Sequence, residues 1–158
     1  MTTAGDAGIE LEELVRTELI ASAVPERSYL MQGPAVRLHT KGADSLALAV
    51  HELATNSLKF GALATPNGHL AVTWAAIEGH VPRLRISWVE SGTTIASLAP
   101  RRRGFGQELI ECTLPYELGA QTRLMFSPGG VVCEIDVPLE ACAVDIEQRP
   151  QAARGGAR

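Results

Sequence analysis

Three polar side chains recur at helical spacing in a segment that otherwise carries mostly small and apolar residues. The segment is AVHELATNSLKFGAL, residues 49–63, and the three are Glu52, Asn56 and Lys59. Steps of four and three residues bring them to one side of a helix, where they can converge on one ligand. The amide oxygen of Asn56 suits Mg²⁺ when phosphate and water oxygens complete the octahedron, and Lys59 offers a compact positive charge to phosphate. The competing interpretation is a solvated helix face.

A second segment, RRRGFGQELI, suggests an anion site before a helix. Gly104 and Gly106 directly precede the expected helix, where free backbone N–H groups and the helix dipole favour an anion. Without side chains at these positions the main chain can approach a phosphate closely, and three arginines at 101–103 lie beside it. A tight turn before a helix is the commoner explanation of Gly-x-Gly. The segment is not a P-loop, because no Gly-Lys-Ser/Thr follows, and no strand leads straight into it as in a dinucleotide fingerprint.

Helices and strands must position these groups, and hydrophobic periodicity predicts where they lie. An apolar stripe of Leu46, Ala49, Val50, Leu53 and Phe60 predicts a long helix from Ala43 to about Phe60. IELEELVRTELIA, from residue 9, predicts a shorter amphipathic helix, and short strand pieces surround the turn at 33–34. These elements supply one helical layer and the start of a sheet.

The second half of the chain predicts more strands than helices. HLAVTWAAI (69–77) and PRLRISWVE (82–90) alternate as half-buried strands, and 122–139 predicts a hairpin turned by SPGG. A loop at 91–106, interpreted as a lid, separates the strands from a third helix at 106–114. Strands that follow one another directly favour antiparallel pairing, so we expect an α+β fold with helices packed on one face of the sheet.

Composition bounds the class of protein. A chain of 158 residues with 46% apolar residues is the size of one domain, and a formal charge of −4 gives no general attraction to nucleic acid or anionic lipid. We expect a flexible N-terminus at 1–8, one domain at 9–140 and a flexible tail at 141–158. Three cysteines without metal-ligand or framework spacing favour free thiols in a reducing compartment. Neither a membrane span nor a signal peptide is recognisable, so a cytoplasmic location without membrane contact is expected.

The motifs around these residues resemble those of the GHKL ATPase superfamily, in the form found in HWE-type sensor histidine kinases. HELATNSLKFGAL resembles the N box, and the name HWE refers to its His and to a later Trp-x-Glu, which here are His51 and Trp88-Val89-Glu90. GFG at 104–106 followed by QELIE resembles the G2 box, and GGVVCEIDVPL resembles the closing strands. Motif order and spacing agree from about residue 10 to 140. The fold this implies is a two-layer GHKL (Bergerat) sandwich, with about three helices on a mixed, mostly antiparallel sheet.

The resemblance implies an ATP site in which Asn56 takes Mg²⁺. Glu52, one turn earlier, would order the water shell of the metal or act as a base, and Lys59 would reach phosphate. Glu90 stands where most relatives outside the HWE group have an Asp that binds the exocyclic amine of adenine, so it would read the base. His51 and Trp88 are interpreted as packing residues. The remaining cofactor positions are Gly92, which would let the base lie against the backbone, and Gly104, Phe105 and Gly106 of the lid.

The resemblance also implies a histidine kinase that needs a partner. After Glu90 the family continues x-Gly-Gly-Pro, whereas Ser91-Gly92-Thr93-Thr94 stands here, so Thr93 is expected to narrow the base pocket or stiffen the lid. The γ-phosphoryl group of ATP would go to a histidine on a separate dimerisation hairpin, in cis or in trans, and then to a response regulator. No histidine of this chain has the family's acceptor pattern; the four are His39, His51, His69 and His80.

Two other functions fit the same fold. A degenerate GHKL module would dock a phosphotransfer or receiver partner without nucleotide, with Thr93 as its hint. An ATP-using serine kinase of the anti-sigma type shares the fold, but its motifs differ from the Trp-x-Glu found here.

Overall fold

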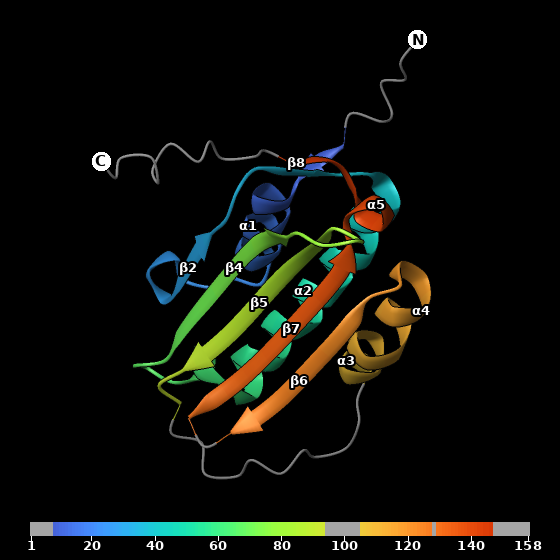
Figure 1. Ribbon diagram of the computed structural model, residues 1–158. Helices are drawn as coiled ribbons and strands as arrows, with labels where there is room; N and C mark the ends of the chain where they lie inside the picture. Colours follow the sequence, from blue (N-terminus) through green and yellow to red (C-terminus); the bar gives the residue numbers. More distant parts are fainter. Residues whose placement is uncertain (1–7, 94–104, 128, 147–158) are drawn as a thin grey trace, which may run out of the picture.

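The computed structural model describes residues 8–93, 105–127 and 129–146. In it a five-stranded sheet is covered on one face by helices, and a smaller three-stranded sheet lies at one end (Figure 1). The large sheet has the order β2-β4-β5-β7-β6; β2 and β4 are parallel and every other pair is antiparallel. The expected α+β sandwich with a mixed, mostly antiparallel sheet is therefore confirmed. Its strands are β2 (Tyr29–Gln32), β4 (His69–Ile77), β5 (Arg83–Ser91), β6 (Gln121–Ser127) and β7 (Gly130–Pro138).

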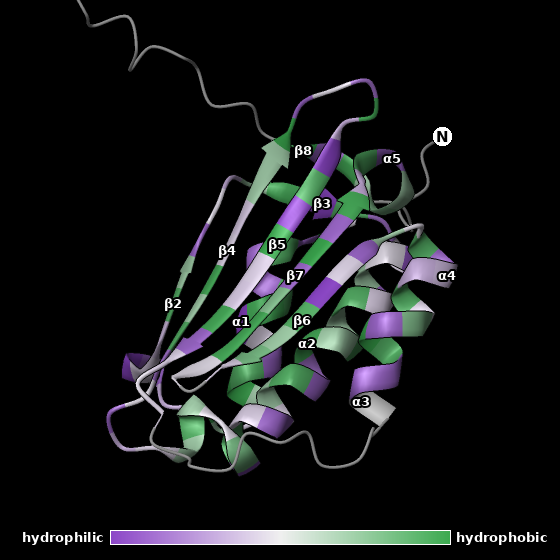
Figure 2. Ribbon diagram, turned by 60° about the horizontal axis from the view of Figure 1, so that its bottom comes forward, coloured by the Kyte–Doolittle hydropathy of each residue, from purple (hydrophilic) through white to green (hydrophobic). Residues whose placement is uncertain are grey.

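The helices lie together on one face of the large sheet (Figures 1 and 2). The helix expected at 106–114 is longer and has three parts, with a π-helical stretch between two short α-helices. Two single 3₁₀ turns, η2 (Glu26–Ser28) and η3 (Ala62–Ala64), connect other elements. The helical layer consists of α1 (Leu11–Ala21), α2 (Thr40–Phe60), α3 (Phe105–Glu108), the π-helical η4 (Leu109–Thr113) and α4 (Leu114–Leu118).

Of the small sheet, the sequence predicted only the strand piece that is β3 (Val36–Leu38). The other two strands, β1 (Ile9–Glu10) and β8 (Ala143–Ile146), have two and four residues, too few to show a period. β3 pairs with both β1 and β8, so the chain after β7 returns to lie beside strands from the start of the sequence. The tail expected from residue 141 therefore starts too early, because α5 (Leu139–Cys142) and β8 continue the fold to Ile146.

The core lies between α2 and the covered face of the sheet. In β5 every second side chain is buried, and Trp88 is the largest of the core side chains that are less than 2% exposed. α2 contributes Leu46, Val50 and Leu53, which are buried as its apolar spacing predicts. Figure 2 shows the alternation of hydropathy along the strands. Phe60 was wrongly expected in this stripe: it is the last residue of α2 and is 64% exposed.

A charged cluster joins β5 and β7 on the open face of the sheet. Arg85 and Asp136 are register partners, and Arg83 lies two residues away on the same face. Arg83 Nε donates to Asp136 Oδ1 at 2.6 Å, and Arg85 Nη2 donates to Oδ2 at 2.8 Å. Burial of Asp136 disfavours its charge, but the hydrogen bonds from Arg85 and Arg83 outweigh burial and hold its pKa below the ordinary value.

The three cysteines are free thiols, as expected. Cys133 and Cys142 are buried, and burial raises the pKa of each thiol to about 12. Cys112, in η4, is exposed. Among the helices of the described residues, none combines the length and apolar character that crossing a membrane requires.

Candidate functional site

The polar side chains of α2 lie away from its buried stripe, as their spacing predicts. α2 starts after His39, whose Nδ1 accepts a hydrogen bond from Gly42 N at 3.3 Å and caps the helix. Further along the helix, Glu52 is half-buried, while Asn56 and Lys59 are exposed. None of these three forms a hydrogen bond or ion pair with another described residue. They are therefore available to a ligand on that side of α2.

Glu90, near the end of β5, is a buried acid with two internal donors. It faces the core two residues after Trp88 and is only 5% exposed. Trp88 Nε1 donates to its Oε2 at 2.7 Å, and the backbone N–H of Ala62, in η3, donates to Oε1 at 3.0 Å. Burying even a neutral polar group without a hydrogen bond costs about 2–7 kcal/mol, and an isolated carboxylate costs more. The two bonds account for an acid in this position.

Two glycines let the main chain come close to this acid and to the strand end. A Cβ added to Gly61 would collide with Glu90 Oε1, so the end of α2 can approach the carboxylate only without a side chain. Gly92 has φ +76°, and a Cβ there would lie 2.6 Å from the carbonyl oxygen of Asn67. Missing side chains at these two positions therefore let the main chain pack closely around the end of β5, where a side chain would not fit.

The third group of expected site residues is only partly described. α3 starts at Phe105, so Gly106 is its second residue and does not precede the helix as expected. The Gly106 N–H still belongs to the first turn, whose donors have no partner within the helix. Gly104, the arginines at 101–103 and most of the expected lid lie outside the described residues.

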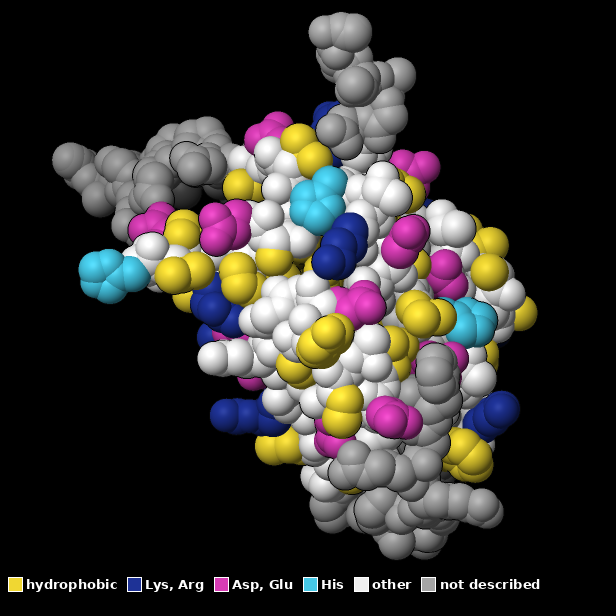
Figure 3. All heavy atoms as spheres, turned by 90° about the vertical axis from the view of Figure 1, so that its right-hand side faces the viewer, with side chains coloured by type: hydrophobic (Ala, Val, Ile, Leu, Met, Phe, Trp, Pro, Cys, Tyr) yellow, Lys and Arg dark blue, Asp and Glu magenta, His cyan; other side chains and the backbone are white. Residues whose placement is uncertain are grey.

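α3 and α4 both pack against α2. Buried Leu109, Ile110, Leu114 and Leu118 fix this helical segment to the rest of the domain. Figure 3 faces the side of the domain that carries α3 and α4, and shows acidic and apolar side chains scattered over it. The first turn of α3 is thus held on the same helical layer as the polar side chains of α2.

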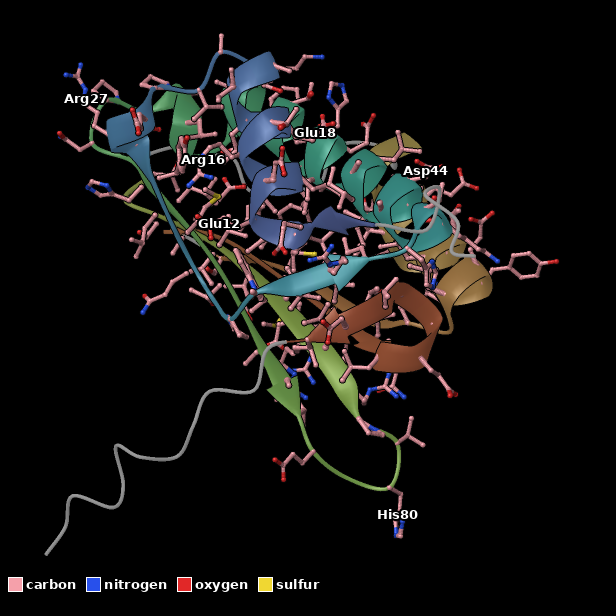
Figure 4. All side chains as sticks on the ribbon, turned by 90° about the horizontal axis from the view of Figure 1, so that it is seen from above. Glu12, Arg16, Glu18, Arg27, Asp44 and His80 are labelled. Atoms are coloured by element: carbon pink, nitrogen blue, oxygen red, sulfur yellow. The ribbon has the colours of Figure 1, made fainter. Side chains whose placement is uncertain are left out.

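His51 lies on a different side of α2. Its Nδ1 is 3.3 Å from Glu18 Oε1 on α1, which runs beside α2 (Figure 4). Five residues along a helix turn a side chain through about 140°, so His51 points away from Asn56. The structure thus supports a role for His51 in holding α1 against α2.

The sequence predicted only a packing role for Trp88, and the hydrogen bond from its indole to Glu90 was not predicted. The signal was present, because residues two apart on a strand lie on one face. The other donor, Ala62 N–H, could not be found from sequence spacing, since it depends on where the chain returns after α2.

The sequence has curated relatives that are named blue-light-activated histidine kinases. The protein from Brucella anthropi is 37% identical over 110 residues, which are 69% of this chain and 22% of that protein. The protein from Brucella ovis is 33% identical over 137 residues, which are 84% of this chain and 27% of that protein. The chain thus spans about a quarter of the length of these relatives. No protein-family model matches it.

Solved structures share the fold at lower sequence identity. The histidine kinase domain of the blue-light-activated kinase EL346 from Erythrobacter litoralis superposes with a TM-score of 0.63 at 20% identity, over 89% of this chain and 66% of that one. The catalytic domain of histidine kinase ThkA gives a TM-score of 0.60 at 17% identity, over 82% of this chain and 94% of that one. The arrangement of helices on the sheet is therefore that of known kinase catalytic domains.

Proposed function

Because the chain belongs to the catalytic domains of HWE-type histidine kinases, we propose that it binds Mg-ATP and supplies the γ-phosphoryl group to a histidine held elsewhere. The acceptor would lie on a dimerisation hairpin, in cis in a longer chain or in trans, and a response regulator would act downstream in the cytoplasm. The observation that carries the proposal is the combination of an unpartnered polar face on α2 with a buried acid, Glu90, that closely packed glycines approach.

The donor set on α2 fits a magnesium–phosphate group. Asn56 would bind Mg²⁺ through its amide oxygen, a hard and neutral ligand that leaves room for phosphate and water. Glu52, one turn away, would order the water around the metal or act as a base, and Lys59 would contact phosphate. When bound, Mg²⁺ would neutralise charge on the phosphates, while the protein groups keep them in place.

The chemistry of Glu90 suits recognition of a purine base. Glu90 would accept a hydrogen bond from the exocyclic amine of adenine, whereas guanine offers an oxygen there, which cannot donate to the acid. Gly92 would let the base lie against the main chain. The first turn of α3, with Phe105 and Gly106, would close the site towards phosphate together with Gly104.

The proposed reaction requires the protein mainly to position the phosphates and to neutralise their charge. Phosphoryl transfer requires little covalent chemistry from the protein, and these groups supply a carboxylate, an amide and an amine around the phosphates. His80 lies at the tip of the β4–β5 hairpin (Figure 4), and His39 lies at the cap of α2. Neither is on a helical hairpin, where the family's acceptor histidine is expected. We therefore expect the isolated chain to bind ATP but to turn it over slowly or not at all. The family relationship does not favour the alternative of a degenerate docking module that binds no nucleotide.

Thermal unfolding with and without Mg-ATP tests the proposal. At about one hundred times Kd, ligand binding adds about 2.7 kcal/mol to the unfolding free energy, a rise in Tm of about 5–10 °C for a domain of this size. Asn56→Ala should lose most of that rise. Thr55→Ala is the matched control, because its Oγ1 bonds only the His51 carbonyl of the same helix. An equal rise in Asn56→Ala and wild type would remove the metal role of Asn56.

A further inference from the structure

The carboxylate of Glu90 is held from two directions by groups that cannot easily move. Trp88 Nε1 donates to Oε2 at 2.7 Å from within β5, and Ala62 N donates to Oε1 at 3.0 Å from η3. Trp88 is 1% exposed, and its neighbours in register on the adjacent strands are Val72 and Cys133, both fully buried. The indole N–H is therefore a fixed donor, whose direction is set by the core.

The backbone of Glu90 is confined as well. A Cβ added to Gly130, at the start of β7, would collide with the Glu90 carbonyl oxygen. A Cβ on Gly61 would collide with the carboxylate itself. The main chain thus closes on Glu90 from two sides, and the two hydrogen bonds select one orientation of the carboxylate in the space that remains.

This arrangement leaves part of the carboxylate for a ligand. Two carboxylate oxygens offer about four acceptor directions, and Trp88 and Ala62 use one on each oxygen. The remaining directions are fixed before a ligand arrives, so a base amine meets an acceptor that needs no reorganisation. If the indole donor were lost, Ala62 N alone would hold the carboxylate. The acid could then tilt about that one bond, and the discrimination between an amine and a carbonyl at that edge of the base would weaken.

We propose that Trp88 is a positioning residue for base recognition: its indole N–H fixes the carboxylate of Glu90 in the orientation that selects adenine over guanine. This inference rests on the proposed function and assigns to the Trp of the Trp-x-Glu motif a role beyond core packing.

The test compares two tryptophans that have the same chemistry in different places. Trp74, in β4, is 4% exposed and donates from its Nε1 to the Pro34 carbonyl oxygen at 2.7 Å. Trp74→Phe and Trp88→Phe therefore each remove a buried indole and one hydrogen bond of equal length. Only Trp88→Phe removes a donor to Glu90. Each variant is measured for its Kd towards Mg-ATP and Mg-GTP by calorimetry, and for its unfolding free energy in urea.

Both variants should lose stability, but their nucleotide selectivity should differ. The loss of a hydrogen bond to a charged group is expected to lower the ATP-to-GTP preference of Trp88→Phe about tenfold, while Trp74→Phe keeps the preference of the wild type. An unchanged preference in Trp88→Phe, or an equal loss in both variants, overturns the inference. Wild-type protein that binds neither nucleotide would instead overturn the proposed function.

A second replacement covers the case in which Trp88→Phe does not fold. 3-Benzothienylalanine at position 88 keeps the shape of the indole but carries sulfur in place of N–H, so it removes the donor without opening a cavity. It should lower the ATP-to-GTP preference about tenfold, as expected for the loss of the indole donor. A wild-type preference in this protein would overturn the role of the indole N–H.

Discussion

Replacing Gly61 by alanine should disturb the fold at the carboxylate of Glu90. The new Cβ would lie well under 3.0 Å from Oε1, and it would also be 3.0 Å from Ser57 Cα and 3.2 Å from Ser57 Oγ. The chain of α2 therefore leaves it no room to retreat, and the carboxylate must shift by about 1 Å to restore ordinary contact. Such a shift stretches the 3.0 Å bond from Ala62 N beyond hydrogen-bonding distance.

The cost follows from the groups left without a partner. Ala62 and Glu90 are both buried, and an unsatisfied buried donor or acceptor costs about 1–3 kcal/mol. Alanine also restricts the unfolded chain, which returns about 0.4–1 kcal/mol. The cost of the lost hydrogen bond therefore exceeds the gain from the restricted unfolded chain. We expect Gly61→Ala to lower the unfolding free energy by about 1–3 kcal/mol and to weaken Mg-ATP binding.

Urea unfolding, followed by circular dichroism, measures the first effect, and calorimetry measures the second. Gly129→Ala is the matched control, because a Cβ there meets nothing within 4 Å; it should leave both quantities close to wild type or raise stability slightly. A Gly61→Ala protein as stable as Gly129→Ala would refute the reasoning, since Glu90 would then tolerate displacement from Ala62.

Two further predictions concern groups outside the site. The pKa of the Asp136 carboxyl is held below its ordinary value. Its stabilising contribution is therefore complete above the unfolded pKa of about 4 and is lost as pH falls through the lower folded value. Urea unfolding at a series of pH values should show that Asp136→Asn loses less unfolding free energy on acidification than wild type, and an equal loss would contradict this prediction. Iodoacetamide at pH 8 should modify only Cys112 in the native protein, because Cys133 and Cys142 are buried and have pKa values of about 12. If mass spectrometry finds the label on Cys133 or Cys142, the burial of these thiols is contradicted.

The sequence predicted the elements whose pattern is local. α2, β4 and β5 have clear periods over nine or more residues, and each lies within a few residues of its expected range. β1 and β8 could not be predicted in this way, because their short segments gain their structure by pairing with β3. The parallel pairing of β2 with β4 likewise depends on a crossover that no local pattern encodes.

The candidate site was predictable to a similar degree. Helical spacing put Glu52, Asn56 and Lys59 off the buried stripe, and strand alternation could have joined Trp88 to Glu90. The contact between Glu90 and Ala62 is different, because it joins residues 28 positions apart through a turn whose path is set by tertiary packing. The resemblance supplied the expected role of Glu90, but its internal hydrogen bonds became visible only in the structure.

A crystal structure of the protein with Mg²⁺ and a non-hydrolysable ATP analogue tests the central claim most directly. We expect the adenine amine within hydrogen-bonding distance of Glu90, Mg²⁺ on the amide oxygen of Asn56 and the triphosphate between α2 and the start of α3. An analogue bound elsewhere, or no nucleotide in contact with Glu90 and Asn56 at saturating concentration, would contradict this claim.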